Sequence, residues 1–319
     1  MIEKPAGERM RPEIIQRRES DTAGPSGAYR LKPNEPTAFS VRRVLRGRVD
    51  SAVERLHDPD ADPAKAVHGA RKDMKKLRSA LRLVRPVAGE AAYERENARY
   101  RDAARLLSGV RDTQARAETI DALAKRFGDD EPPGGWGAIS SALESEGSPV
   151  ELDRVRGEAA ARIEAGRRAA QTLALPASGG ALLRPGLERS YARGRRRLAQ
   201  AAEEPTDERL HEWRKRAKDL WYHLRLIRSA RPPVLDPLVE QASELSDLLG
   251  DDHDLALLAA ALDAGERLSG EQHAQLGLFI SRRRGELQRA AFEAGERLYA
   301  ERPKAFARRL AAYWDDAAA

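Results

Sequence analysis

The sequence contains no cysteine among its 319 residues, which excludes disulfides, thiol catalysis and thiolate metal sites. Aromatic residues make up only 5% of the chain, and no apolar stretch approaches the roughly 20 residues that a membrane-spanning helix requires. The first residues carry charges where a secretory signal would need an apolar run. We therefore expect a soluble, cytoplasmic protein without a role at a membrane.

Common catalytic motifs are missing as well. The chain has no Gly-rich phosphate loop, no GxSxG nucleophile elbow and no HExxH zinc motif. A catalytic carboxylate would need a partner base, and the spacing identifies none for Asp112 or Asp254. These two residues are better interpreted as helix caps or ion-pair partners. We expect a protein that is not an enzyme and that uses no cofactor.

Charge dominates what is present. Charged residues make up 34% of the chain, with 57 Lys and Arg against 51 Asp and Glu. This composition is typical of long amphipathic helices rather than of a β-sandwich. The formal net charge of +6 and the pI near 9.6 indicate an anionic partner. Because the two signs nearly balance, the clustering of the cations matters more than their total.

Two stretches 143 positions apart are nearly alike, one beginning at His68 and the other at His211. Over eighteen aligned positions, nine residues are identical: His, Arg, Lys, Lys, Leu, Leu, Arg, Leu and Arg. A weaker pair of matches, Leu106–Asp112 and Leu248–Asp254, keeps nearly the same register. The sequence therefore predicts an internal duplication. Because the repeated residues are mostly cations, both units are expected to meet one anionic partner.

Apolar residues recur at helical spacing and no segment alternates with period two, so the sequence predicts an all-α fold. Turn and cap residues place helices at about 37–56 with Thr37 as N-cap, 63–84 stopped by Pro86, 89–107, 112–127, a short one after 137, 150–173, 187–202, 207–229, 238–249, 254–264, 271–301 and after Pro303. Residues 1–36 are expected to be a flexible tail. The Gly- and Pro-rich stretch Pro176–Gly186 divides the remainder into two helical halves, 37–177 and 178–319.

Placed on a helix of about 100° per residue, each repeat separates into two faces. The first cationic face contains His68, Arg71, Lys72, Lys75, Arg78 and Arg82, and the second contains His211, Arg214, Lys215, Lys218, Tyr222 and Arg225. Apolar stripes lie opposite: Val67, Ala70, Met74, Leu77, Leu81 and Val84 in the first repeat, and Trp213, Ala217, Leu220, Leu224 and Ile227 in the second. Each cationic face is a strip roughly 21 Å long.

A row of cations on one helix face repels itself by a few tenths of a kcal/mol per i,i+4 pair. The ordinary interpretation of such a row is a solvated polar face. The near absence of Asp and Glu from both faces, and their matching register, favour a ligand instead. Arg supplies forked donors and Lys a mobile charge, which together suit phosphate groups. A long polyanion would release counterions, so its affinity should fall steeply with salt.

The two histidines lie on the cationic faces and could donate to phosphate oxygens. Neither His68 nor His211 has a second histidine or a carboxylate four residues on, so no metal site is expected. Arginines on the helices that precede the two repeats are weaker candidates for extending the basic surface: Arg42, Arg46, Arg193 and Arg197.

These residues resemble the CHAD family, the conserved histidine α-helical domain. The resemblance rests on His68-x-x-Arg71-Lys72-x-x-Lys75-Lys76-Leu77-Arg78, on His211-x-x-Arg214-Lys215-x-x-Lys218, and on the Leu-rich segments ending Arg111-Asp112 and His253-Asp254, and it covers roughly residues 36–317. It implies two pseudo-symmetric antiparallel helical bundles around a basic central groove or pore. It also implies that the matched cations, Lys76 included, bind inorganic polyphosphate, and that the protein associates with polyphosphate granules in bacteria. Free phosphate or sulfate ions would fit the same site.

Three positions depart from exact repetition. Trp221 stands where the first copy has Arg78, Asp219 where it has Lys76, and His253 where it has Arg111. The second cationic face should therefore be the less basic one. Some members of the family carry an additional triphosphate-hydrolysing domain with an E-x-E-x-K motif. That motif is absent here, so a stand-alone binding module is expected rather than a hydrolase.

Two other functions stay open. A nucleic-acid-binding or scaffolding helical protein would also bind in a salt-dependent way, although the chain has no recognisable DNA-docking motif. A phosphate-processing enzyme would release phosphate from polyphosphate in the presence of a divalent metal. The residues indicate neither an oligomeric state nor a preferred chain length of the ligand.

Overall fold

The computed structural model describes residues 29–107, 112–128, 130–142, 149–263 and 268–319. Within these residues all regular structure is helical and no strand is present, which confirms the predicted all-α class. The helices are α1 (Thr37–His57), α2 (Pro63–Ala88), α3 (Glu90–Leu106), α4 (Asp112–Arg126), α5 (Gly135–Ala142), α6 (Pro149–Glu164), α7 (Arg167–Thr172), α8 (Gly179–Glu203), α9 (Asp207–Ile227), the 3-10 turn η1 (Arg228–Ala230), α10 (Pro232–Asp263), α11 (Gly270–Leu298) and α12 (Pro303–Ala318).

Capping side chains, a proline and a glycine determine where several helices begin and end. The Asp62 carboxylate accepts from the Lys65 amide at 2.8 Å at the start of α2, where Pro63 occupies the first turn. Ser269 and Gln272 form a reciprocal capping box at the start of α11. Gly89, with φ of +87°, separates α2 from α3 in a conformation that only glycine adopts readily.

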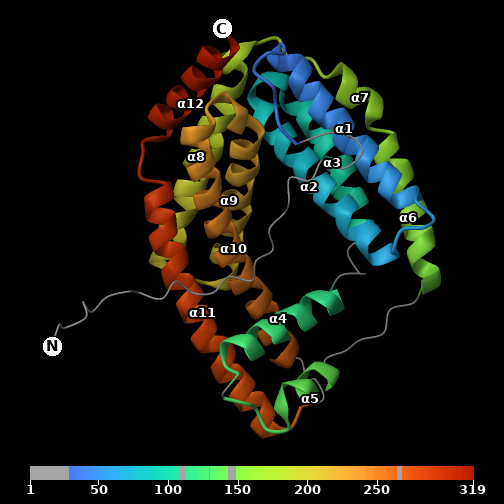
Figure 1. The fold of residues 1–319 in the computed structure, drawn as a ribbon, viewed down its shortest axis with the longest axis vertical. Helices are drawn as coiled ribbons and strands as arrows, with labels where there is room; N and C mark the ends of the chain where they lie inside the picture. Colours follow the sequence, from blue (N-terminus) through green and yellow to red (C-terminus); the bar gives the residue numbers. More distant parts are fainter. Residues whose placement is uncertain (1–28, 108–111, 129, 143–148, 264–267) are drawn as a thin grey trace, which may run out of the picture.

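The helices pack as two groups that lie side by side in Figure 1. One group contains α1, α2, α3, α6 and α7, and the other contains α8 to α12. Helices α2 and α9, which carry the two repeats, lie on the inner sides of their groups, and their ribbons diverge away from their C-terminal ends. Helix α4 precedes the second group in the chain but packs against that group's α10 and α11. It lies at the end of the molecule toward which α2 and α9 diverge.

The two groups contact one another where α2 crosses α8 and α9. A Cβ atom at Gly186 of α8 would lie 1.7 Å from the Leu83 carbonyl oxygen of α2, so the backbones touch at this crossing. Nearby, the buried His223 of α9 donates from Nε2 to the Ser79 carbonyl of α2 at 2.9 Å. Glycine at position 186 and a neutral imidazole at position 223 thus define how closely the groups approach.

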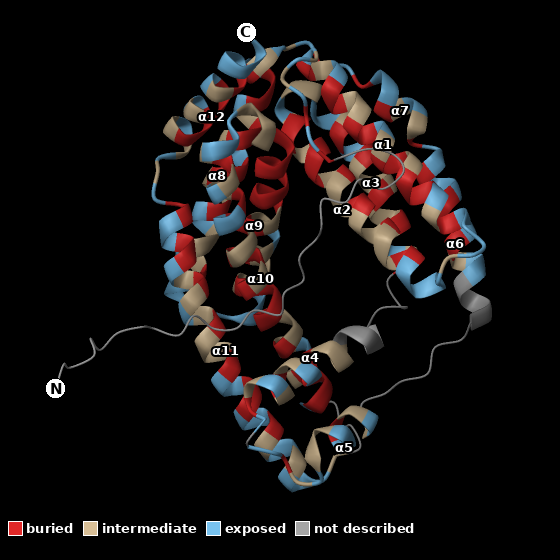
Figure 2. Ribbon diagram, viewed as in Figure 1, coloured by how far each residue is buried: buried red, intermediate tan, exposed pale blue. Residues whose placement is uncertain are grey.

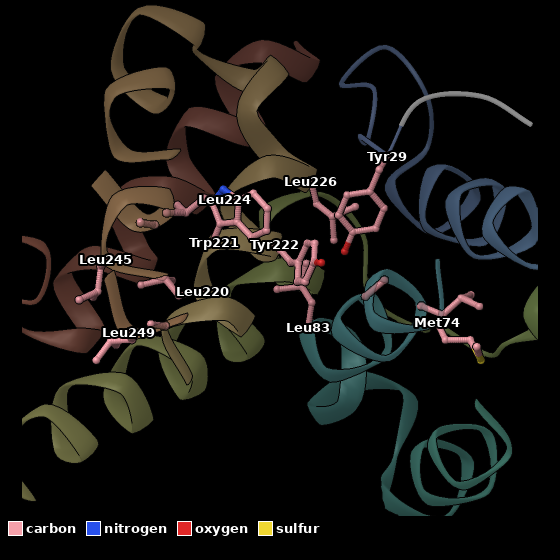
Figure 3. Close-up of a cluster of buried hydrophobic side chains, with 14 of the residues drawn as sticks. Tyr29, Met74, Leu83, Leu220, Trp221, Tyr222, Leu224, Leu226, Leu245 and Leu249 are labelled. Atoms are coloured by element: carbon pink, nitrogen blue, oxygen red, sulfur yellow. The ribbon is translucent and has the colours of Figure 1, made fainter. Parts of the chain in front are cut away.

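A short segment before α1 is anchored in the same contact region. Leu31 donates its amide to the Leu226 carbonyl at 2.7 Å, and Tyr29 donates its hydroxyl to the Lys76 carbonyl at 3.1 Å. Both side chains are buried, and the Tyr29 ring packs edge-on against Tyr222, as Figure 3 shows. The predicted flexible tail therefore does not extend through residue 36, since residues 29–31 belong to the core; residues 1–28 lie outside the described part of the chain.

The buried side chains follow the predicted apolar stripes. In Figure 2 they are concentrated on the sides of the helices that face their neighbours, most densely along α9 and α1. The five apolar positions predicted for the second repeat are all fully buried, and those of the first repeat are at most 4% exposed. Removal of this apolar surface from water is the main stabilising contribution.

Three predicted helix boundaries inside the chain are corrected. The segments 238–249 and 254–264 form one continuous helix, α10, so Asp254 lies inside a helix and cannot cap one. Helix α8 starts at Gly179, which places Pro185 and Gly186 inside it rather than in a linker. Conversely, the predicted helix 150–173 is interrupted between α6 and α7.

Packing explains these differences. A single glycine such as Gly250 costs a helix about 1 kcal/mol, which the buried leucines on both sides of it in α10 outweigh. The break after α6 coincides with Gly166, where a Cβ atom would lie 2.4 Å from the Tyr100 hydroxyl. Smaller corrections are that α2 continues two residues beyond Pro86, and that Pro36 rather than Thr37 is the N-cap of α1. The Thr37 hydroxyl instead accepts from the Trp314 indole at 3.0 Å.

Candidate functional site

The first cationic face lies on α2 as the helical spacing predicts. Its apolar stripe is buried, and its cationic side is half-buried along its whole length: His68, Arg71, Lys72, Lys75, Lys76, Arg78 and Arg82. Because α2 is on the inner side of its helix group, its packing against α1 and α3 directs this side away from the group's own core. The stripe thus fixes the direction in which the charges point.

Several of these residues also make contacts within the protein. Arg71 donates from Nη1 to the Leu107 carbonyl at 2.8 Å, and Arg78 donates from Nε to the Asn97 side chain at 3.0 Å. In the second repeat, Arg214 lies beside Gly250, which is 143 positions after Leu107. The contact between the cationic helix and its neighbouring helix is therefore present in both repeats. In the first repeat α3 ends at this contact, whereas in the second repeat α10 continues past it.

The second cationic face divides into two parts. His211, Arg214 and Lys218 are half-buried and Lys215 is exposed, whereas Tyr222 and Arg225 are both 2% exposed. Arg225 lies 4.8 Å from the Trp221 ring and about as near to Tyr29 as to Tyr222, at 5.9 and 6.0 Å. Arg225 is thus part of the packed contact between the helix groups and does not extend the accessible cationic face.

One lysine from each repeat lies near an aromatic ring of this contact between the helix groups. Lys76 lies 5.9 Å from the Tyr29 ring and Lys218 lies 5.7 Å from the Trp221 ring. Such contacts stabilise a cation by roughly 0.5–1 kcal/mol near a surface. Trp221, which stands where the first repeat has Arg78, therefore provides an aromatic ring beside Lys218. Lys215 is different, because Glu212 accepts from its ammonium group at 2.6 Å.

The contact of His211 with a second histidine was not predicted from the sequence. Its imidazole lies against that of His253 from α10, with ring centroids 4.2 Å apart and ring planes tilted by 33°. Burial and the charge of Lys215 lower the pKa of His211, and burial and Arg214 lower the pKa of His253 to about 4. Both rings are therefore neutral at pH 7. The signal was the match of His253 to Arg111, but Arg111 and the side chain of Asp112 lie outside what the structure describes.

Asp219 joins the two helix groups electrostatically. Its carboxylate accepts from Arg82 of α2 at 2.8 Å and forms a 3.1 Å ion pair with Arg216 of its own helix. Asp219 is only 8% exposed. The residue that makes the second repeat less basic thus holds a cation of the first repeat in place.

The arginines predicted to extend the basic surface have separate environments. Arg42 donates from Nε to the Leu173 carbonyl at 2.9 Å, and Arg46 is exposed beside Asp50. Arg197 donates to Gln200 at 2.8 Å. Arg193 is half-buried, and its burial together with the charge of Arg216 lowers its pKa. Of these four residues, Arg193 lies closest to the contact between α2, α8 and α9.

Within the described residues, no group of three or more His, Asp or Glu side chains is arranged to hold a metal ion. None of the described helices is long and apolar enough to cross a membrane. The arrangement offers cationic donors of the kind that suit anionic groups.

Comparisons with known proteins agree with this reading of the residues. The model of the family described as the CHAD domain matches residues 43–263. The fold is similar to PptA from Streptomyces chartreusis, with 17% identity, a TM-score of 0.56 and coverage of 84% of this chain and all of that one. It is also similar to the CHAD domain from the plant Ricinus communis, with 16% identity, a TM-score of 0.54 and coverage of 85% and 94%. A search of curated proteins found no match.

Proposed function

The chain belongs to the CHAD domain family, and from this premise we propose that it binds inorganic polyphosphate without catalysing a reaction on it. The observation that carries the proposal is the orientation of the two repeats. Each places cations on one side of an inner helix and a buried apolar stripe on the other. A linear polyanion running between α2 and α9 would contact both rows.

The accessible parts of the two faces are unequal. On α2 the row from His68 to Arg82 is continuous, while on α9 it is limited to His211, Arg214, Lys215 and Lys218. Glu212 also neutralises part of the charge of Lys215. We therefore assign the larger share of the binding energy to α2, and we place the interior of the chain where the two helices diverge.

The spacing of the donors suits a repeating phosphate chain. Successive cations on one face are three or four residues apart, about 4.5–6 Å along the helix. Each interior phosphate of a polyphosphate carries about one negative charge, so a row of single cations matches a row of single anions. Guanidinium and ammonium groups both donate to phosphate oxygens, the former in forked pairs. Association with cytoplasmic polyphosphate granules is part of the same proposal.

The alternative ligand is nucleic acid, and the environment of the aromatic residues favours polyphosphate over it. Proteins that bind single strands stack bases on accessible aromatic rings. The aromatic residues nearest the cationic faces, Tyr29, Trp221 and Tyr222, are all at most 6% exposed. They are therefore packed into the protein and offer no stacking surface, whereas a phosphate chain needs none.

A competition experiment tests this choice of ligand. Labelled long-chain polyphosphate bound to the protein is displaced with unlabelled polyphosphate, single-stranded RNA or duplex DNA at one salt concentration and equal phosphate concentration. We expect polyphosphate to compete at least about tenfold better than either nucleic acid. Equal or better competition by RNA or DNA would replace the proposal with the nucleic-acid function.

The absence of catalysis is tested separately. The protein is incubated with long-chain polyphosphate and Mg²⁺ or Mn²⁺, and released orthophosphate and chain length are measured over several hours. We expect no release above the protein-free control. Release that depends on protein concentration would establish a phosphate-processing enzyme instead.

A further inference from the structure

Several arginines lie near Asp219 where α2, α8 and α9 meet, and two of them, Arg82 and Arg216, form ion pairs with it. We define this Asp219 cluster by the acid and by the arginines linked to it or to one another electrostatically: Arg78, Arg82 and Arg85 of α2, Arg189 and Arg193 of α8, and Arg216 of α9. Asp219 and Glu90 are the carboxylates that form ion pairs with it, the latter with Arg85. The cluster therefore has more cations than anions, and they come from three helices rather than one row.

Much of the donor capacity of this cluster is unused. Among the described residues, the guanidinium groups of Arg189 and Arg193 donate no hydrogen bond, and the buried Nε of Arg216 has no acceptor. The Tyr299 hydroxyl also has no hydrogen-bond partner among the described residues. It lies against Gly194, and its pKa is influenced by the charges of Asp219 and Arg216. Of these groups, the Arg216 Nε and the Tyr299 hydroxyl are buried without a partner, which is costly. Arg189 is exposed and Arg193 is half-buried, so their donors are open to a ligand.

Mutual repulsion is a second sign of an incomplete environment. Burial, and then the charge of Arg82, lower the pKa of Arg78 to about 10, and burial with Arg216 lowers the pKa of Arg193. Both remain protonated at neutral pH, so the protein holds close cations that disfavour one another. Such an arrangement is stabilised by an added negative charge.

We propose that the Asp219 cluster binds a phosphate group that carries two negative charges, and that this group is the end of a polyphosphate chain. This inference rests on the proposed function. A terminal phosphate ionises a second time near pH 6 to 7, as phosphate monoesters do, whereas interior phosphates carry one charge each. The linear cationic faces match the interior of the chain, and a three-sided group of forked donors matches its end.

Asp219 would remain in place when the phosphate binds. It engages one nitrogen each of Arg82 and Arg216, and a guanidinium has five N–H groups, so both arginines keep donors for a ligand. Arg189 and Arg193 contribute all of theirs. The acid thus orients two arginines toward the phosphate, and the remaining cations supply the net positive charge.

The test compares a phosphate chain that has ends with one that has none. Binding of linear tripolyphosphate and of cyclic trimetaphosphate is measured by calorimetry at pH 7.5 for the wild type, for Arg189→Gln/Arg193→Gln and for Lys72→Gln/Lys75→Gln. The two variants remove the same charge, one pair from the cluster and the other from the first cationic face. Neither Arg189 nor Arg193 donates a hydrogen bond to a described residue, so their replacement should leave the fold intact.

We expect the wild type to bind the linear ligand at least about tenfold more tightly, the size of one charge-assisted hydrogen bond. Arg189→Gln/Arg193→Gln should remove this preference, and Lys72→Gln/Lys75→Gln should weaken both ligands and keep it. Absence of a preference in the wild type, or equal weakening of both ligands by the cluster variant, would overturn the inference.

Two further readouts separate the alternatives. If orthophosphate displaces tripolyphosphate from the wild type at equal concentration, the cluster recognises free phosphate and the assignment to a chain end is wrong. Thermal unfolding without ligand should show Arg189→Gln/Arg193→Gln to be as stable as the wild type or more so, because repulsion is relieved; a clear loss would indicate a structural role. Failure of long-chain polyphosphate to bind the wild type would reject the proposed function, while a preference for linear over cyclic ligand would still stand.

Discussion

Arg82 of α2 donates a hydrogen bond from Nη1 to the Asp219 carboxylate of α9 at 2.8 Å, across the contact between the two helix groups. The two residues are 137 positions apart in the chain. One lies on the first cationic face, and the other is the acid that interrupts the repeat on α9. This ion pair therefore connects the two helix groups and also positions Arg82, a candidate ligand-binding cation.

Replacement of Asp219 by asparagine should destabilise the protein. The side chain keeps its shape but loses the charge that compensates Arg82 and Arg216 in a site where Asp219 is 8% exposed. We expect a loss of about 2–4 kcal/mol in the free energy of unfolding, measured by urea denaturation. Asp316→Asn, which removes an exposed acid paired with Arg231, should cost less than about 0.5 kcal/mol. Similar losses of unfolding free energy in both variants would show that the buried Asp219 ion pairs stabilise the protein no more than an exposed one.

The crossing of α8 over α2 depends on glycine at position 186. In Gly186→Ala the added methyl would meet the Leu83 carbonyl at 1.7 Å, so the helices would have to separate. We expect a loss of about 2–4 kcal/mol in unfolding free energy, at the upper end of overpacking effects. Gly157→Ala on α6 has nothing within 4 Å of the new methyl and should stabilise by about 0.5–1 kcal/mol. A stable Gly186→Ala protein would contradict the close crossing.

His223 should make stability depend on pH. Burial lowers its pKa to about 4 from the ordinary 6.5, and its Nε2–H is already committed to the Ser79 carbonyl. Above pH 6.5 the ring is neutral in the folded and unfolded chain, so stability is fully present. As the pH falls toward 4, only the unfolded chain takes up the proton, and stability is lost by up to about 1.4 kcal/mol per pH unit.

Urea unfolding at several pH values between 7.5 and 4.5 measures this slope. His223→Gln keeps a donor for Ser79 but does not titrate, so its slope should be smaller than that of the wild type by about one proton. Part of the slope should remain, because the pKa of His253 is also lowered to about 4. His57→Gln on the exposed end of α1 serves as control. Identical slopes for wild type and His223→Gln would refute the assignment.

The neighbouring histidines His211 and His253 should couple polyphosphate binding to proton uptake. Both pKa values are lowered by burial and by neighbouring cations, and a polyanion beside Arg214 and Lys215 would oppose the effect of those cations. The affinity for long chains should therefore rise roughly three- to tenfold as the pH falls from about 7 to 5. His253→Gln should reduce this rise. A pH-independent affinity would place the ligand away from the pair.

The sequence was sufficient for the parts of this molecule that depend on local periodicity. The stripe through Met74 and Leu77 and its counterpart through Trp213 and Leu220 were predicted from spacing, and all four residues are fully buried. The directions of the cationic faces follow from these stripes. The all-α class likewise follows from the 3.6-residue period and the absence of alternating segments.

Features that depend on distant packing could not be predicted in this way. Arg225 has the spacing predicted for a ligand-binding cation, but it is buried near Tyr29, which is 196 positions earlier in the chain. Gly250 has the local character of a helix end, yet the leucines around it keep α10 continuous. The ion pair of Asp219 with Arg82 and the contact of His211 with His253 join helices whose relative placement no local pattern specifies.

The salt dependence of binding shows whether the cationic faces of α2 and α9 bind polyphosphate. The affinity of long-chain polyphosphate is measured across a range of salt concentrations for three proteins. These are the wild type, a variant with Lys72, Lys75, Lys215 and Lys218 changed to Gln, and a charge-matched control with the exposed Arg154, Arg168, Lys304 and Arg308 changed to Gln.

We expect submicromolar binding by the wild type and a linear fall of log affinity with log salt concentration. The variant of the two faces should lose most of the affinity, and its slope should be shallower by roughly 3, the value for four lost phosphate contacts on a single strand. The control should resemble the wild type in both respects. Equal affinities and slopes for the face variant and the control would contradict the claim that these two faces hold the ligand.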